Sequence, residues 1–459
     1  MDTAHSGPLV NFPAARVITP QSPEYLEACK LYNGMIQKRP GYILRCQSKA
    51  DVQAAVEFAR SNDLLVAIRG GGHNGPGLGS CDDGVVIDMS AMNDVEVDPD
   101  GMTVRAGAGC TQGEVDAAAS AHGLAVPAGI VASTGVGGLT LGGGHGYLTR
   151  KYGLTIDNLL KAEVVLADGR EVVASEDENE DLFWALRGGG GNFGVVTAFT
   201  YRARPVDHVF AGPIFYDISY AGEIMRWYRD ALSAMPRELC IFLGLKTVPS
   251  TDPFPKDIWG RRICALIACY DGSEGDGRAE MEAVHAALPK PLMDGMAPMR
   301  FVDVQAMFDP LLPSGLQWYW KGDYVRQLTD AAIDIHLDHG GRTPSELSLM
   351  HLYPIDGAVH DVARDATAWS ARDQTWSMVI TGIDPDPQKA EALRTWAKDY
   401  WSALHAENAH GGAYVNFMMD DEGDERVAAA YGENFARLRN VKAKYDPGNH
   451  FRVNHNIRP

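Results

Sequence analysis

The first 205 residues alternate between helical and extended hydrophobic patterns. Apolar side chains recur at helical spacing over residues 51–63, and the apolar run 64–69 ends at a glycine cluster, as a buried strand does. Two β-branched runs predict further strands, and a helix follows them, at residues 84–90, 95–107 and 111–124. An Asp-Gly turn breaks the second run, and Gly123 is expected to end the helix. This pattern is typical of an α+β fold.

Glycine dominates the next part of the pattern. Residues 127–146 form the densest glycine stretch, and residues 162–175 predict a hairpin turned at Asp168-Gly169. A short helix from Asp181 then leads into four glycines and out again as a strand at 195–203. Glycines in such a turn allow another group to approach the backbone closely.

Beyond about Pro205 the character of the chain changes. Glycine clusters disappear, aromatic residues become frequent, as at 317–324, and long helices alternate with apolar strands. A helix is predicted from near Pro387, and Asp446-Pro447-Gly448 should end a second one, followed by a short strand or coil. The change of pattern indicates a second domain.

Charge and cysteine content narrow the possible functions. Lys and Arg number 41 against 60 Asp and Glu, and the resulting net charge of −19 repels nucleic acids and anionic membranes. No secretory signal or run of roughly 20 apolar residues is present, so a cytoplasmic protein is expected. The seven cysteines are scattered without a CxxC pair, which predicts buried free thiols and no metal site.

Two stretches match the GxGxxG pattern of dinucleotide-binding folds. That pattern requires a helix immediately after it, because the helix N-terminus holds the pyrophosphate. Residues 70–75 run into Pro76 instead, and residues 189–194 run into the predicted strand, so a Rossmann site is rejected. Three glycine-rich loops within about 125 residues still predict one large phosphorylated cofactor. His73 lies in the first loop as a candidate general base, metal ligand or covalent anchor, and metal is the weakest of these.

Four motifs in order along the chain resemble the berberine-bridge-enzyme-like oxidases of the vanillyl-alcohol-oxidase fold group. They are IRGGGHN at 68–74, GVGGLTLGGGHGYLTRKYGLTIDNL at 135–159, DLFWALRGGGGNFGVVTAF at 181–199 and KYDPGNHFRVNHNI at 444–457. The motifs are also similar to those of bacterial secondary-metabolism members such as the enterocin favorskiiase. The resemblance implies a two-domain, PCMH-type FAD-binding fold. Residues 1–205, completed by 415–459, would bind FAD, and residues 206–414 would form a substrate domain with an antiparallel sheet flanked by helices.

The same resemblance implies a covalent flavin. The loop around Arg69 to Asn74 would hold the pyrophosphate, and His73 would bond to the flavin 8α carbon. Val131 stands where some members carry a second, cysteinyl link, so a single covalent link is expected. Thr134 would lie near the flavin edge, although its hydroxyl could equally serve a turn. The expected cofactor-binding residues are Arg69, Gly70, Gly71, Gly72, His73, Asn74, Ser80, Gly129, Thr134, Gly135, Gly138, Gly142, Gly143, Gly144, His145, Gly191, Gly194, Val196, Asn416 and Asn454.

The resemblance further implies an oxidase. Such an enzyme transfers hydride from a substrate C–H to flavin N5, and O2 then reoxidises the flavin to give H2O2. The expected substrate is a small or medium organic molecule: an alcohol, a secondary metabolite or a cyclic amine. A carbohydrate or oligosaccharide oxidase is the alternative, against which Val131 argues mildly, and a dehydrogenase or oxygenase of the same fold stays open. Substrate and O2 are the expected partners, and the sequence does not determine the oligomeric state.

Proton chemistry is expected from the second domain. Strand alternation at 413–417 would place Tyr414 beside Asn416, which makes Tyr414 the first candidate for a base or substrate clamp. Alternation at 351–359 presents His351 with Tyr353, as a catalytic pair or as partners satisfied within the sheet. His145 stands where the family pattern suggests an aromatic or aliphatic residue. Two weaker candidates, Tyr319 and Lys321, suit packing or a structural ion pair.

Overall fold

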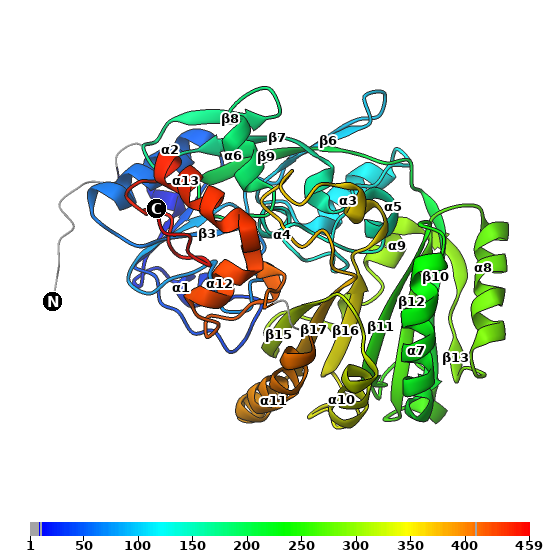
Figure 1. The fold of residues 1–459 in the computed structure, drawn as a ribbon. Coiled ribbons are helices and arrows are strands. Elements are labelled where there is room, and N and C mark those ends of the chain that lie inside the picture. Colours follow the sequence, from blue (N-terminus) through cyan, green and yellow to red (C-terminus); the bar gives the residue numbers. More distant parts are fainter. Residues whose placement is uncertain (1–8, 10–11, 409–410) are drawn as a thin grey trace.

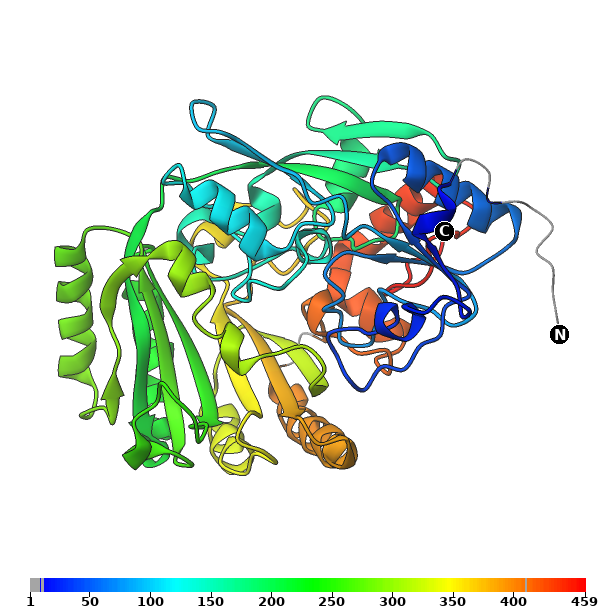
Figure 2. The same cartoon turned by 180° about the vertical axis from the view of Figure 1, so that it is seen from behind.

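The computed structural model describes residue 9, residues 12–408 and residues 411–459. The described residues form three sheets, two from the first half of the chain and one from the second half (Figure 1). The C-terminal helices, red in Figures 1 and 2, return to lie against the N-terminal part. This arrangement confirms the predicted α+β class.

The first sheet places the His73 loop. Its strands lie in the order β1 (Val17–Ile18), β2 (Tyr42–Arg45), β4 (Val85–Asp88) and β3 (Val66–Arg69). The last three are parallel and almost continuously apolar, as strands covered on both faces must be. Helix α2 (Lys49–Ser61) packs near them, and its first turn is capped by the Ser48 side chain. β3 ends at Arg69, so the glycine loop leaves the carboxyl edge of the sheet.

The second sheet is antiparallel. Its strands lie in the order β5 (Val95–Asp98), β6 (Thr103–Gly107), β9 (Val195–Arg202), β7 (Leu159–Val165) and β8 (Glu171–Ser175). Both predicted hairpins are confirmed, and Gly169 adopts the left-handed conformation with φ +84° that its turn requires. Between β6 and β7 lie α3 (Gln112–Ser120), α4 (Val136–Gly142) and α5 (Thr149–Tyr152). Helix α6 (Glu180–Leu186) precedes the glycine turn that leads into β9.

The third sheet is antiparallel and comes from the second half of the chain. Its main path is β13 (Met293–Asp294), β10 (His208–Asp217), β12 (Arg262–Tyr270), β11 (Leu239–Thr247), β16 (Leu349–Pro354), β17 (Trp376–Asp384) and β15 (Gln317–Val325), and β14 (Ala297–Arg300) pairs with β10. One face carries α7 (Ala221–Ala231), α10 (Asp330–Gly340) and α11 (Ala390–Asn408) (Figure 1). Two further helices, α8 (Glu274–Ala287) and α9 (Phe301–Gln305), pack near β10.

The C-terminal segment closes over the second glycine turn. Helices α12 (Asp424–Tyr431) and α13 (Phe435–Tyr445) precede an irregular tail that contains no strand. The fully buried ammonium of Lys442 donates hydrogen bonds to the backbone oxygens of Asn192 and Phe451, at 2.8 and 2.9 Å, and pairs with Asp446 at 2.6 Å. Because a buried charge must be fully paired, these bonds tie the tail firmly to residues 188–194.

One local prediction is wrong. Residues 413–417 do not form a strand: a 3-10 turn spans Val415–Phe417, and the Phe417 N–H bonds the Tyr414 carbonyl at 2.8 Å. Because these backbone groups are hydrogen-bonded within the turn, they are not available to pair with a neighbouring strand. The prediction of buried free thiols is confirmed, because the seven cysteines are free and buried. Among the described residues, no helix is long and apolar enough to cross a membrane.

Candidate active site

A cavity of about 430 Å³ separates the glycine loops from the open face of the third sheet. The residues that follow β3 and those around Gly135 and Gly191 line one side, and the C-terminal tail joins them at Asn454. The opposite side is apolar and aromatic. It includes Phe215, Phe242, Phe254, Ile267, Trp318, Trp320, Leu349, Val379 and Ile383.

The glycines around this cavity have two distinct roles. A Cβ on Gly71 would lie 2.4 Å from the Gly135 nitrogen, so these two loops touch through their backbones alone. In contrast, a Cβ on Gly138 or Gly191 would meet no protein atom within 4 Å, although both residues line the cavity. Packing within the protein does not explain these two glycines. A flat or phosphorylated ligand placed against the backbone does.

Unpaired polar atoms also point to a ligand here. Buried polar side-chain atoms normally have hydrogen-bond partners. Yet both ring nitrogens of His145, the amide oxygen of Asn454 and Nε2 of His455 have none within the described chain, and all three residues line the cavity. The cavity wall therefore fits a large polar cofactor such as FAD.

His73 is held between two neighbours at the edge of this cavity. Its ring stacks on Tyr32 with centroids 3.8 Å apart and 17° between the planes, and its Nε2 lies 3.0 Å from Oγ of Ser133. Burial lowers the pKa of His73 to about 4, so the imidazole is neutral near pH 7. A neutral, oriented imidazole keeps a lone pair on one ring nitrogen and can act as a nucleophile.

Arg69 is committed to the protein itself. Its guanidinium donates to the Ala28 carbonyl at 2.7 Å and to Asp88 at 2.9 Å, and the side chain is buried. The Arg69 side chain is therefore not free for a ligand. The backbone N–H groups of residues 70–74, which border the cavity, have no hydrogen-bond acceptor among the described residues.

Most of the predicted site residues line the cavity together. They are Arg69, Gly70, Gly71, Gly72, His73, Asn74, Gly129, Thr134, Gly135, Gly138, His145, Gly191, Gly194, Val196, Asn416 and Asn454, with Tyr414, His351 and Tyr353. Four predicted residues do not line it: Ser80, Gly142, Gly143 and Gly144. Ser80 is fully buried with an unpaired hydroxyl. Gly142 instead makes room for Asn416, whose amide nitrogen would lie 2.4 Å from an added Cβ.

The Tyr414 hydroxyl is a fixed polar point inside the cavity. It accepts hydrogen bonds from the Gly144 N–H at 3.0 Å and from the Asn416 amide at 2.8 Å. Burial raises the pKa of Tyr414 to about 12, although both donors act in the opposite direction. A neutral phenol that accepts two bonds retains its own proton, so it can donate a hydrogen bond to a ligand.

His351 and Tyr353 form a hydrogen-bonded pair on β16, as alternation predicts. Nδ1 of His351 lies 2.7 Å from the Tyr353 hydroxyl, and both rings face the cavity. Burial lowers the pKa of His351 to about 3 and raises that of Tyr353. The Tyr353 ring also lies 5.1 Å from that of His145, whose pKa burial lowers to about 3. Through the contact between Tyr353 and His145, this pair on the third sheet reaches the glycine-rich wall of the cavity.

Comparison with known proteins matches this geometry. Residues 40–175 match an FAD binding domain, and residues 413–458 match the berberine and berberine-like domain. (R)-6-hydroxynicotine oxidase of Paenarthrobacter nicotinovorans is 30% identical over 463 residues, covering 96% of both chains. An uncharacterized FAD-linked oxidoreductase of Bacillus subtilis, YgaK, is 32% identical over 461 residues, covering 97% of both. The chain belongs to the berberine-bridge-enzyme-like family of FAD-linked oxidoreductases.

A solved structure of this family matches the whole fold. The crystal structure of 6-hydroxy-D-nicotine oxidase from Arthrobacter nicotinovorans superposes with a TM-score of 0.86 at 26% identity and covers 99% of both chains. The predicted two-domain PCMH-type fold is thereby confirmed. FAD is consequently the cofactor that fits the glycine loops of this oxidoreductase.

Two features of the oxidoreductase were not predicted as parts of its site. Lys246 on β11 lines the cavity, and burial lowers its pKa to about 8. In the sequence, Lys246 stands near the end of an apolar run. A lysine at such a position is just as typical of a strand that ends in solvent. Ser133 holds His73 from the same stretch as Val131, which lines the cavity. The only feature of the sequence that could have indicated a role for Ser133 is its position beside the GVGG motif.

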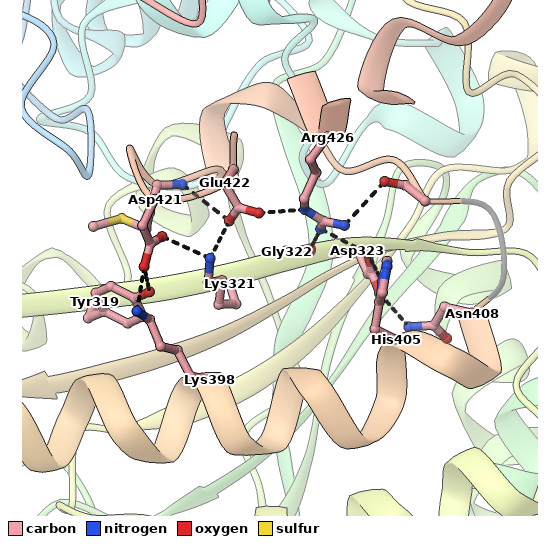
Figure 3. Close-up of polar contacts among 12 residues, drawn as sticks. Tyr319, Lys321, Gly322, Asp323, Lys398, His405, Asn408, Asp421, Glu422 and Arg426 are labelled. Carbon is pink, nitrogen blue, oxygen red and sulfur yellow. Dashed lines mark hydrogen bonds and ion pairs between the residues drawn. The ribbon is translucent and has the colours of Figure 1, made fainter. Parts of the chain in front are cut away.

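The weaker candidates Tyr319 and Lys321 are structural (Figure 3). The Lys321 ammonium pairs with Asp421 at 2.9 Å and Glu422 at 2.8 Å, and the Tyr319 hydroxyl donates to Asp421. Along the same strand, the network continues through Asp323, Arg426, His405 and Asn408. The ion pairs thus join β15 to α11 and to the segment that carries Tyr414 and Asn416.

Proposed function

We propose that the protein is an oxidase that holds FAD covalently through His73 and oxidises a C–H bond of a small or medium organic substrate, an alcohol, a secondary metabolite or a cyclic amine. When bound, FAD supplies the hydride acceptor, and O2 takes up the electrons as H2O2. The observation that carries the proposal is the single cavity shared by unexplained glycines, unpaired polar atoms and His73.

The glycine-rich wall is proposed to hold the cofactor. Gly70 to Gly72 carry no side chains beside the cavity, and Gly138 and Gly191 leave space for a ring or phosphate. His73 is proposed as the single covalent anchor, because Val131 offers no second nucleophile. The amide oxygen of Asn454 and Nε2 of His455 would pair with polar atoms of the cofactor.

Tyr414 and the His351–Tyr353 pair are proposed to handle the substrate proton. Tyr414 retains a donor hydrogen and suits a clamp on a substrate oxygen or nitrogen. The neutral His351, hydrogen-bonded to Tyr353, is the candidate acceptor of the proton that leaves the substrate as hydride departs. Aromatic and aliphatic side chains around them exclude water, which favours apolar substrates over sugars with many hydroxyl groups.

The domain boundaries and the cellular location are also proposals. Residues 1–205 with 415–459 are proposed as the FAD-binding domain and residues 206–414 as the substrate domain, with the cavity between them. Seven free, buried thiols are compatible with a reducing compartment, which supports a cytoplasmic location.

The proposal is tested by screening the yellow holoprotein with alcohols and cyclic amines in an oxygen electrode. An oxidase consumes one O2 and releases one H2O2 for each substrate oxidised. Substrate that bleaches the flavin without air oxidation restoring it would instead indicate a dehydrogenase. Labelled oxygen recovered in the product would indicate an oxygenase.

A further inference from the structure

Lys246 is a partly buried cation in the cavity wall that has no acidic partner among the described residues. Desolvation lowers the pKa of Lys246 to about 8. Within the described chain it makes no ion pair, and no Asp or Glu lines the cavity. The other cation in the wall, Arg69, is already neutralised by Asp88. An ammonium that is partly removed from water and has no counterion is costly, and an anionic ligand in the cavity would offset that cost.

The surroundings of Lys246 locate that partner on the substrate side. Lys246 follows Phe242 and Gly244 along one face of β11, and these residues lie across from Tyr353 and His351 of β16. Four residues of extended strand place Lys246 about 13 Å beyond Phe242. Tyr353, next to Phe242, contacts His145 of the glycine-rich wall. Lys246 therefore lies farther along β11, away from this contact. A Cβ on Gly244 would lie 2.8 Å from the His351 ring, so glycine keeps this row compact.

The walls beside Lys246 limit what else the partner can be. Leu349 lies directly across the β11–β16 pair from Lys246, Thr381 lies across from Leu349 on β17, and Leu347, Phe254 and Ile383 also line the cavity. Such side chains accept a flat or apolar body, while the ammonium requires an anionic oxygen.

We propose that the oxidase selects substrates that carry a carboxylate on an apolar, flat body, with Lys246 binding the carboxylate and His351 and Tyr414 facing the portion to be oxidised. The inference rests on the proposed oxidase function and names its substrate class. Lys246 would then determine substrate specificity through its positive charge and would take no part in proton transfer.

Binding of a matched acid and amide to the holoprotein tests the proposal without turnover. Calorimetry with trans-cinnamate and trans-cinnamamide compares the same apolar body with and without charge. We expect wild type to bind cinnamate about tenfold or more tighter than the amide. Lys246→Met should remove that preference, Lys246→Arg should keep most of it, and the exposed Lys290→Met serves as the charge control.

The outcomes separate this proposal from that of the oxidase itself. Equal affinity of the two ligands for wild type, or a preference that survives in Lys246→Met, overturns the carboxylate site. The comparison of the two ligands on wild-type protein needs no variant, so it tests the carboxylate site even if a variant folds poorly. Flavin content and peroxide release, measured separately, report on the oxidase proposal and not on Lys246.

Discussion

Nε2 of His73 lies 3.0 Å from the hydroxyl oxygen of Ser133, and the Tyr32 ring stacks on the imidazole with the ring centroids 3.8 Å apart. When Nε2–H donates to Oγ, the lone pair resides on Nδ1. The serine hydroxyl can donate or accept, so the contact orients the ring in either tautomer. The low pKa of His73, about 4, keeps the ring unprotonated at neutral pH.

Ser133→Ala is expected to slow attachment of FAD without abolishing it. The variant removes one hydrogen bond, which corresponds to a roughly fivefold to tenfold slower reaction. The attached fraction is followed by intact mass after FAD is added to protein produced in riboflavin-limited cells. Ser90→Ala, an exposed serine near the same cleft, is the control. Unchanged attachment in Ser133→Ala would remove any role for the contact.

Tyr414→Phe is expected to lower turnover about tenfold to a hundredfold while the ring stays in place. The loss of the hydroxyl also leaves the buried Gly144 N–H without an acceptor, which should cost about 1–3 kcal/mol of stability. Steady-state kinetics and urea unfolding measure the two effects. Tyr324→Phe, buried but outside the cavity, should retain turnover, and an active Tyr414→Phe would exclude the clamp.

Acid should destabilise the protein partly through His145. Because burial lowers the folded-state pKa of His145 from 6.5 to about 3, the unfolded chain binds the proton more readily, and the free energy of unfolding falls as the pH drops below about 6.5. At pH 5 this loss is about 2 kcal/mol relative to pH 7. His145→Phe should reduce the pH 7 to pH 5 difference in unfolding free energy by about that amount. The exposed His208→Phe should not, and equal changes in both would contradict the assignment.

Breaking the ion-pair network of Figure 3 should affect both stability and catalysis. Arg426→Met removes the arginine from two buried carboxylates, leaving Glu422 with Lys321 and Asp323 with His405, at a cost of up to about 3–5 kcal/mol. It also loosens the segment that presents Tyr414, so kcat should fall as well. Arg229→Met, which breaks a surface pair with Asp330, should cost under about 1 kcal/mol. A fully stable Arg426→Met would show that the network contributes little.

The sequence predicted the elements whose signals are local. The glycine loops, the 95–107 and 162–175 hairpins and the His351–Tyr353 face each follow from short-range spacing, and the structure has them. Residues 413–417 failed because alternation in five residues does not distinguish a strand from a turn closed by its own hydrogen bond. Tyr414 nevertheless lies beside Asn416, as predicted, through a side-chain contact of 2.8 Å.

Other parts of the site depend on long-range packing. Gly142 to Gly144 match the family motif, yet their tight contacts serve Asn416, Trp369 and Thr155 from elsewhere in the chain. Lys246 carries no motif, and only the assembled cavity shows that it lacks an acidic neighbour. A single sequence contains neither kind of information.

Intact mass after acid denaturation, compared between wild type and His73→Ala, tests the central claim most directly. Wild-type protein should carry the added mass of one FAD and His73→Ala should carry none, because Val131 cannot form a second link. Wild-type protein that releases its flavin on denaturation, or a His73→Ala variant that keeps the added mass, would contradict covalent attachment at His73.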